Sequence, residues 1–262
     1  ASPQRTGCGE TGKLVREFAK NNLPNKCHVI DVNCDSLCQP RGFTTFTNIF
    51  LVPLIMSSDL GVKNICCGAV LGSTCLRSGN KFYNQFDTRK RNKWFKFYDE
   101  IGVHVFSLIA GCSELITSKI VYKNNLSSEV LFCQADDGRP CYKCAKCFRK
   151  VLELNYNGYP IQKSAWDNYE GRTISNFLRK RPLYFSHMFI ETIKNNPDLP
   201  KDIRCCIKDI IDTETSFFNK IYSKSFVYFP REIKDILIER LTKYADVMSD
   251  EEERCLENWD MT

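Results

Sequence analysis

Four cysteines, Cys133, Cys141, Cys144 and Cys147, lie within fifteen residues of the chain. Two of the gaps between them contain two residues, so a tight turn lets consecutive sulfurs approach one point. The longer loop, residues 134–140, can bring the fourth thiolate over the other three. Structural zinc requires this tetrahedral arrangement, with sulfur ligands at about 2.3 Å and no open coordination position. The spacing therefore predicts a structural Zn²⁺ site.

Two other interpretations of these cysteines remain open. An iron–sulfur cluster uses a C-x₂-C-x₂-C run, and a further cysteine and a proline come after that run. Here the residues that follow are Phe148, Arg149 and Lys150, and the fourth cysteine lies upstream. The cysteines can also be unrelated buried thiols. Zinc fits the spacing better than either alternative.

The chain contains fifteen cysteines, an odd number in 262 residues. The length, the odd count and the lack of a signal peptide argue against a secreted disulfide scaffold. We expect most of these thiols to act as small hydrophobic residues in the reducing cytosol. No apolar run approaches the roughly 18 residues that a transmembrane helix needs. The sequence therefore predicts a cytoplasmic protein that does not enter a membrane.

The formal net charge of +6 is unevenly distributed along the chain. Residues 88–93 and 179–181 are basic, whereas residues 250–253 are acidic. Such clusters are usually solvated faces, and the alternative is that the basic ones contact phosphate or nucleic acid.

Helices and strands alternate in the first part of the chain. Hydrophobic periodicity predicts helices at 12–21, 46–60, 93–102 and 113–122, and strands at 27–32, 62–71 and 103–108. Ser113 is the expected N-cap of its helix, with Glu114 in the first turn. This order indicates an α/β fold with a parallel sheet.

The pattern changes after Pro160, where no strand of quality is indicated. Helices are expected at 166–179, 183–195, 201–212, 213–224 and 230–244. Ser249 and Glu252 have capping-box spacing for a last short helix. We therefore predict two parts: an α/β domain, residues 1–158, that ends in the four-cysteine motif, and an all-α extension, residues 159–262.

Residues 7–13 match the phosphate-loop pattern G-x₄-G-K, but Leu14 occupies the position where Mg²⁺ binding needs Ser or Thr. A glycine-rich entry to a helix is the better interpretation.

Residues 131–150, with their four cysteines, resemble the zinc motif of 7-cyano-7-deazaguanine synthase and its relatives in the PP-loop pyrophosphatase superfamily. Further segments resemble that family in the same order along the chain: 14–32, 47–50, 65–73, 86–89 and 117–120. The resemblance covers residues 10–155. It implies a Rossmann-like sheet of the adenine-nucleotide-hydrolase type.

The resemblance also implies chemistry. Such enzymes use ATP with Mg²⁺ to convert a carboxylate or amide oxygen into an acyl-adenylate, after which a nitrogen or sulfur nucleophile displaces AMP. The residues that match its site are Asn48, Gly68, Gly72 and Ser73 beside the nucleotide or substrate, and Arg89 and Lys119 as catalytic positive charges. Zinc would orient the nearby segment, because four thiolates leave no open position.

The chain departs from the family at several positions. The Ser-Gly-Gly-x-Asp-Ser loop and the strand before it are absent, and we expect them upstream of Ala1. Thr47 replaces an arginine, and Ser73 stands where an acidic residue is common. A small-molecule substrate, ATP and a second copy of the chain in a homodimer are the expected partners. The alternatives are a non-catalytic zinc-stapled module that binds nucleic acid or protein, and a tRNA-thiolating or sugar-amidotransferring PP-loop enzyme.

Overall fold

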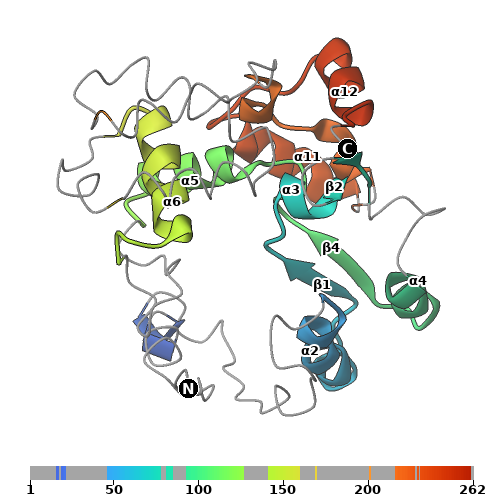
Figure 1. Ribbon diagram of the computed structural model, residues 1–262. Coiled ribbons are helices and arrows are strands. Elements are labelled where there is room, and N and C mark those ends of the chain that lie inside the picture. Colours follow the sequence, from blue (N-terminus) through green and yellow to red (C-terminus); the bar gives the residue numbers. More distant parts are fainter. Residues whose placement is uncertain are drawn as a thin grey trace.

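The computed structural model describes residues 16–17, 19–21, 46–77, 81–84, 93–126, 141–159, 169, 201, 216–227, 229 and 231–260 (Figure 1). The strand expected at 27–32 lies outside these residues. So do the helices expected at 166–179, 183–195 and 201–212, apart from Tyr169 and Lys201.

Helix α2 spans Phe46–Leu60, as the sequence predicted. It ends at Gly61, whose φ of 63° lies in the left-handed region that favours glycine. The Val62 N–H then donates to the Ser57 carbonyl at 2.8 Å, which closes the end of the helix. The chain thereby reverses direction into the first strand.

Strands β1 (Asn64–Cys67) and β4 (His104–Ser107) pair in parallel, with Cys67 opposite Ser107 at their carboxyl ends. Helix α4 (Lys93–Glu100) leads into β4 and lies near its start (Figure 1). Both predicted strand locations are confirmed. The parallel sheet within the described residues consists of these two strands. The wider Rossmann-like sheet therefore remains a prediction.

The strand expected over 62–71 was too long, and its last residue belongs to a helix. Residues 68–70 form a loop, and Leu71–Thr74 form the short helix α3. The Leu71 N–H donates to the Cys112 carbonyl at 2.8 Å, and the Thr74 hydroxyl donates to the Ala110 carbonyl at 3.0 Å. These bonds to the loop after β4 turn the chain away from the sheet.

A small antiparallel hairpin that the sequence did not predict follows α3. It consists of β2 (Leu76–Arg77) and β3 (Lys81–Phe82). The Phe82 N–H donates to the Trp259 carbonyl at 2.8 Å, and Lys81 forms an ion pair with Asp260. The hairpin therefore pairs with the last described residues of the chain.

Two helices carry the site described below. Helix α5 spans Glu114–Lys123, and its predicted N-cap, Ser113, is confirmed. Helix α6 spans Ala145–Tyr156 and packs against α5. None of the helices within the described ranges is long and apolar enough to cross a bilayer.

The C-terminal region contains the 3₁₀ helices η3 (Ser216–Asn219) and η4 (Ser223–Phe226) and the helices α11 (Arg231–Leu241) and α12 (Asp250–Glu257). The capping box that begins α12 at Ser249 is confirmed. The single helix expected at 213–224 is wrong. Ile221 instead forms a parallel bridge with Val247, and its N–H donates to the Asp246 carbonyl at 2.8 Å.

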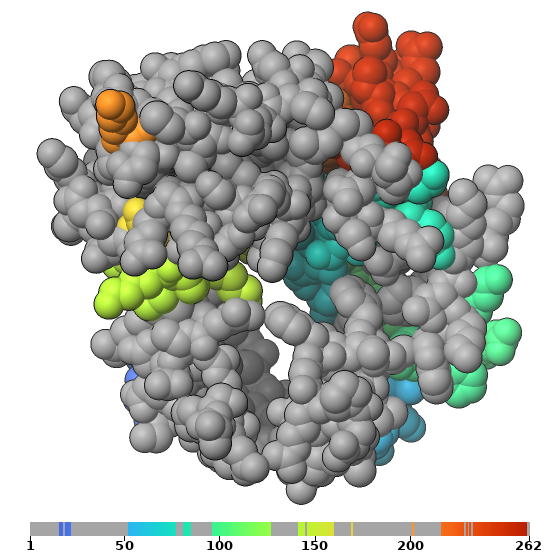
Figure 2. All heavy atoms as spheres, viewed as in Figure 1, coloured from blue at the N-terminus to red at the C-terminus, as the bar shows by residue number. Residues whose placement is uncertain are grey.

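The C-terminal region shares one hydrophobic core with the parallel strands. Buried members of this core include Ile65, Val105, Phe106, Ile221, Phe226, Phe229 and Leu241. The rings of Phe106 and Phe229 meet edge to face, with centroids 4.6 Å apart. Figure 2 shows α12, in red, at one end of the visible face, beside the cyan residues of α3 and the hairpin. The described residues beyond 215 thus help to bury the β1–β4 pair.

Candidate metal centre

Three of the predicted zinc ligands converge. The sulfur atoms of Cys141, Cys144 and Cys147 all lie within 4.8 Å of one another, and those of Cys141 and Cys147 are 3.8 Å apart. Tetrahedral ligands at about 2.3 Å from zinc lie about 3.8 Å from each other. The three sulfurs therefore fit three corners of a structural zinc site. Cys133, the predicted fourth ligand, lies outside the described residues.

Local backbone geometry brings these sulfurs together. Tyr142 adopts a left-handed φ of 52°, which tightens the turn after Cys141. Cys144 is the N-cap of α6, and its sulfur accepts a hydrogen bond from the Cys147 N–H at 3.5 Å. The C-x₂-C-x₂-C spacing thus places one cysteine before the helix, one at its cap and one in its first turn.

Aromatic residues enclose the cysteine cluster on one side. Phe148 is fully buried, and its ring meets Tyr169 edge to face at 5.0 Å. Burial, and then the nearby thiols of Cys147, Cys144 and Cys141, raises the pKa of Tyr169. No described residue accepts a hydrogen bond from its buried hydroxyl. The cluster therefore lies partly inside the protein.

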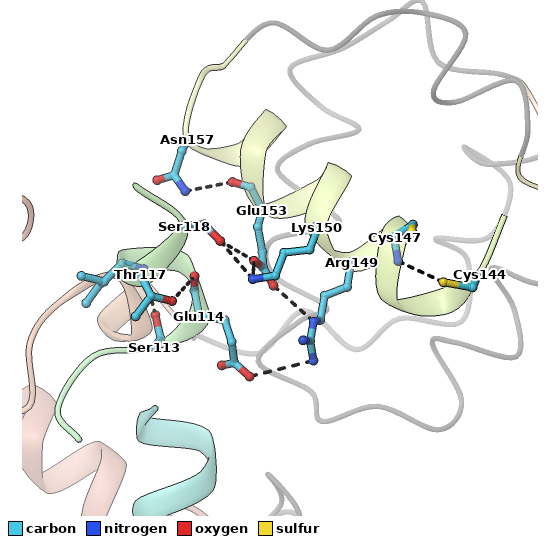
Figure 3. A network of polar contacts seen from close by, with 11 residues as sticks. Ser113, Glu114, Thr117, Ser118, Cys144, Cys147, Arg149, Lys150, Glu153 and Asn157 are labelled. Carbon is cyan, nitrogen blue, oxygen red and sulfur yellow. Dashed lines mark hydrogen bonds and ion pairs between the residues drawn. The ribbon is translucent and has the colours of Figure 1, made fainter. Parts of the chain in front are cut away.

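A buried carboxylate joins the cysteine helix to α5 (Figure 3). Glu153 of α6 is fully buried, and one of its oxygens accepts from the Ser118 hydroxyl and from Lys150 Nζ, each at 2.5 Å. Arg149 Nε lies 3.3 Å from the other oxygen, and the same guanidinium lies 3.9 Å from Glu114. Burial raises the pKa of Glu153, whereas Lys150 and Arg149 oppose that rise.

Asn157 joins the same two helices at the other end of α6. Its side-chain amide donates to the Glu153 carbonyl at 2.8 Å and to the Leu115 carbonyl at 3.2 Å. Sequence reasoning missed both Glu153 and Asn157. Arg149, Lys150 and Glu153 have the spacing of surface ion pairs on a helix. The burial of Glu153 becomes evident only in the fold, where Ser118 of α5 donates to its carboxylate.

Lys119, predicted to be catalytic, lies on α5 next to a pocket of about 330 Å³. The residues that line this pocket are Leu115, Ile116, Lys119, Tyr156, Asn157 and Asn219. Lys119 is half-buried and forms no hydrogen bond or ion pair with the residues that the structure describes. Asn219 is a further candidate that the sequence did not reveal.

One family model matches residues 93–260, and its description is "Family of unknown function (DUF6395)". The chain belongs to the DUF6395 family. The matched DUF6395 segment contains the four cysteines of the motif, the Glu153 network and every residue that lines the pocket. It also continues across residue 159, where the sequence predicted a boundary between two parts. No curated protein and no solved structure matches the chain.

The predicted nucleotide-side residues lie before the DUF6395 match. Gly68 follows the carboxyl end of β1, and Gly72 and Ser73 lie in α3. The Ser107 hydroxyl, at the end of β4, lies 2.6 Å from the Ala69 carbonyl and donates to it. This bond holds the two strand ends and their loops together.

The two remaining predicted residues lie wholly or partly outside the described residues. Asn48 lies in the first turn of α2, and its side chain is outside the described residues, as is the whole of Arg89. The structure therefore gathers Cys141, Cys144 and Cys147 into one centre. It places Lys119 in a separate feature, the pocket beside α5.

Proposed function

We propose that this DUF6395 protein is a cytoplasmic, zinc-stapled enzyme of the 7-cyano-7-deazaguanine synthase type that uses ATP to adenylate a small-molecule substrate. The convergence of Cys141, Cys144 and Cys147 at the start of α6 carries the proposal. It supports the motif on which the resemblance depends. Zinc would hold the 133–147 segment together and would take no direct part in the reaction, because four thiolates fill its coordination sphere.

The order of the elements supports the same function. Parallel strand β4 is followed directly by α5, and α5 packs against the cysteine helix α6. In open α/β sheets, ligands bind outside the carboxyl ends of parallel strands. Gly68 and Ser73 follow the carboxyl end of β1, and Ser107 ends β4 beside them. ATP would therefore bind at this edge.

The proposed reaction has two steps. A carboxylate or amide oxygen of the substrate attacks the α-phosphorus of ATP, the bond to the bridging oxygen breaks, and pyrophosphate leaves with Mg²⁺. A nitrogen nucleophile then attacks the activated carbon, and AMP leaves with the oxygen. Negative charge develops on the phosphate oxygens in the first step, so fixed cations stabilise its transition state. Lys119 and Arg89 would supply that charge.

Pyrophosphate release tests the proposal. The full-length natural protein is incubated with ATP·Mg²⁺ and a panel of carboxylates, deazapurine carboxylates and tRNA. We expect pyrophosphate release with at least one acceptor and slower release by Lys119→Ala. Lys123→Ala, an exposed lysine one turn further along α5, is the matched control and should leave the rate unchanged.

Two results would contradict the proposal. One is that ATP·Mg²⁺ neither binds nor reacts with any acceptor. The other is that the protein binds nucleic acid without ATP, with an affinity that decreases steeply as salt increases. That second behaviour belongs to the non-catalytic binding module.

A further inference from the structure

The pocket beside Lys119 is built from three segments that lie far apart in the sequence. Helix α5 contributes Leu115, Ile116 and Lys119, the end of α6 contributes Tyr156 and Asn157, and η3 contributes Asn219. Its volume of about 330 Å³ lies at the lower end of the range of roughly 300–1,000 Å³ for small-molecule sites. The residues beyond 215 therefore complete a cavity that α5 and α6 leave open.

Hydrogen bonds fix the walls of this pocket relative to one another. The Ser113 hydroxyl, at the start of α5, donates to the Phe218 carbonyl of η3 at 2.6 Å. Asn157 holds α6 to α5 through the Leu115 carbonyl at 3.2 Å. The Asn219 amide donates to the Tyr156 hydroxyl, which links η3 to the end of α6. A ligand would therefore meet a preformed site and would pay little for ordering it.

Among the residues that line the pocket, Lys119 carries the charge, and it is positive. Lys119 is half-buried and pairs with no described residue. The acidic residues of α5 and α6 near the cysteine helix are engaged elsewhere, since Glu153 pairs with Lys150 and Glu114 lies 3.9 Å from Arg149. An ammonium group that is partly removed from water gains most from an anionic partner with which it can hydrogen-bond.

We propose that this pocket binds a small oxyanion-bearing molecule, a carboxylate or a phosphate, through the Lys119 ammonium, and that the C-terminal region contributes Asn219 to the site. Leu115 and Ile116 provide an apolar surface for the body of the ligand. The Asn157 amide already donates both of its N–H groups to backbone carbonyls, so Lys119 is the cationic donor for the oxyanion. The inference deepens the proposed function. It rests on that function for identifying the ligand as the substrate or as a phosphate of the nucleotide. The binding itself does not require that reaction.

Calorimetric titration with pyrophosphate, AMP and benzoate tests the site and separates phosphate from carboxylate. We expect the best of these probes to bind the wild-type protein and to bind Lys119→Gln about tenfold more weakly or worse, as for loss of a charged hydrogen bond. Asn219→Asp, which puts a negative charge into the pocket, should weaken binding similarly. Lys119→Arg should retain it, and Lys123→Gln is the matched control. Thermal melts confirm that each variant is folded.

Amine labelling locates the bound probe. Acetylation of lysines by an activated ester, followed by mass spectrometry, should show that the probe protects Lys119 and leaves Lys123 unprotected. The inference is overturned if no probe binds, if Lys119→Gln and Lys123→Gln bind equally well, or if Asn219→Asp has no effect. ATP-dependent pyrophosphate release with no change at Asn219→Asp would leave the proposed function standing and refute the pocket. Probe binding at Lys119 without any binding of ATP·Mg²⁺ would support the pocket and refute the proposed function.

Discussion

Gly111 lies in the connection between β4 and α5, and a substitution there tests how the C-terminal region packs. A Cβ atom at this position would lie 2.4 Å from the Tyr222 carbonyl oxygen, 2.6 Å from Ser225 Oγ and 3.0 Å from a ring carbon of Phe226. The first contact is with backbone, so relief requires movement of η4. That movement would also stretch the bond from the Tyr222 N–H to the Gly111 carbonyl, now 3.0 Å.

The expected cost of Gly111→Ala follows from these contacts. Overpacking a core costs about 1–3 kcal/mol, and weakening one backbone hydrogen bond costs about 0.5–1.5 kcal/mol. The free energy of unfolding should therefore fall by about 2–4 kcal/mol. For a chain of this size each kcal/mol corresponds to about 2–4 °C, so Tm should fall by about 4–16 °C.

Urea and thermal denaturation, followed by circular dichroism, measure the effect. Gly68→Ala is the matched control, because its Cβ would meet only the Ile109 Cδ1 atom, at 4.0 Å. We expect the control to unfold within about 0.5 kcal/mol of the wild type, as ordinary surface substitutions do. The reasoning is refuted if Gly111→Ala is as stable as the wild type, or if both variants lose the same stability.

Three further predictions concern the α5–α6 region and the caps. The wild-type protein should contain about one equivalent of zinc by elemental analysis. Cys144→Ser should lose the zinc together with several kcal/mol of stability, since metal binding is part of folding, whereas Cys255→Ser, at an exposed cysteine, should keep both the zinc and the stability. Because burial raises the pKa of Glu153 in the native state, Glu153 should contribute less to stability as pH rises above about 4.5. The unfolding free energy of wild type minus that of Glu153→Gln should therefore decrease from acid to neutral pH, and a flat difference would contradict this. Ser113→Ala removes a helix cap and a buried hydrogen bond, so the free energy of unfolding should fall by about 2–4 kcal/mol. Ser249→Ala, which removes an exposed cap, should lower it by about 1 kcal/mol. Equal losses of unfolding free energy in chemical denaturation would argue against the buried bond.

Local signals in the sequence predicted much of the fold around the site. The bounds of α2 were found because a periodic apolar pattern ends at Gly61, and the starts of α5 and α12 because Ser113 and Ser249 are caps. The three sulfurs were found because their spacing works through a single turn. Each of these features is determined by residues that are neighbours in the chain.

Features that depend on distant residues were missed. Residues 213–224 were expected to form a helix, yet Ile221 bonds to residues 246 and 248. Consecutive residues of this segment, such as Phe217 and Phe218 or Ile221 and Tyr222, are buried together. Glu153 has the spacing of a surface ion pair, and its burial depends on Ser118, which lies 35 residues earlier. The pocket depends on Asn219, which no local pattern connects with α5. Tertiary context, which periodicity does not encode, decided all three.

The bond between the Ser113 hydroxyl and the Phe218 carbonyl joins residues 105 positions apart, and it sets an order of events during synthesis. A ribosome that adds about 5–20 residues per second needs about 5–20 s to make the intervening chain. The pairing of Ser118 with Glu153 spans only 35 residues, so α5 and α6 can associate well before residue 218 exists. Until then, the apolar ends of β4 and α5 have no C-terminal cover, and the nascent chain exposes a hydrophobic surface that is prone to aggregation.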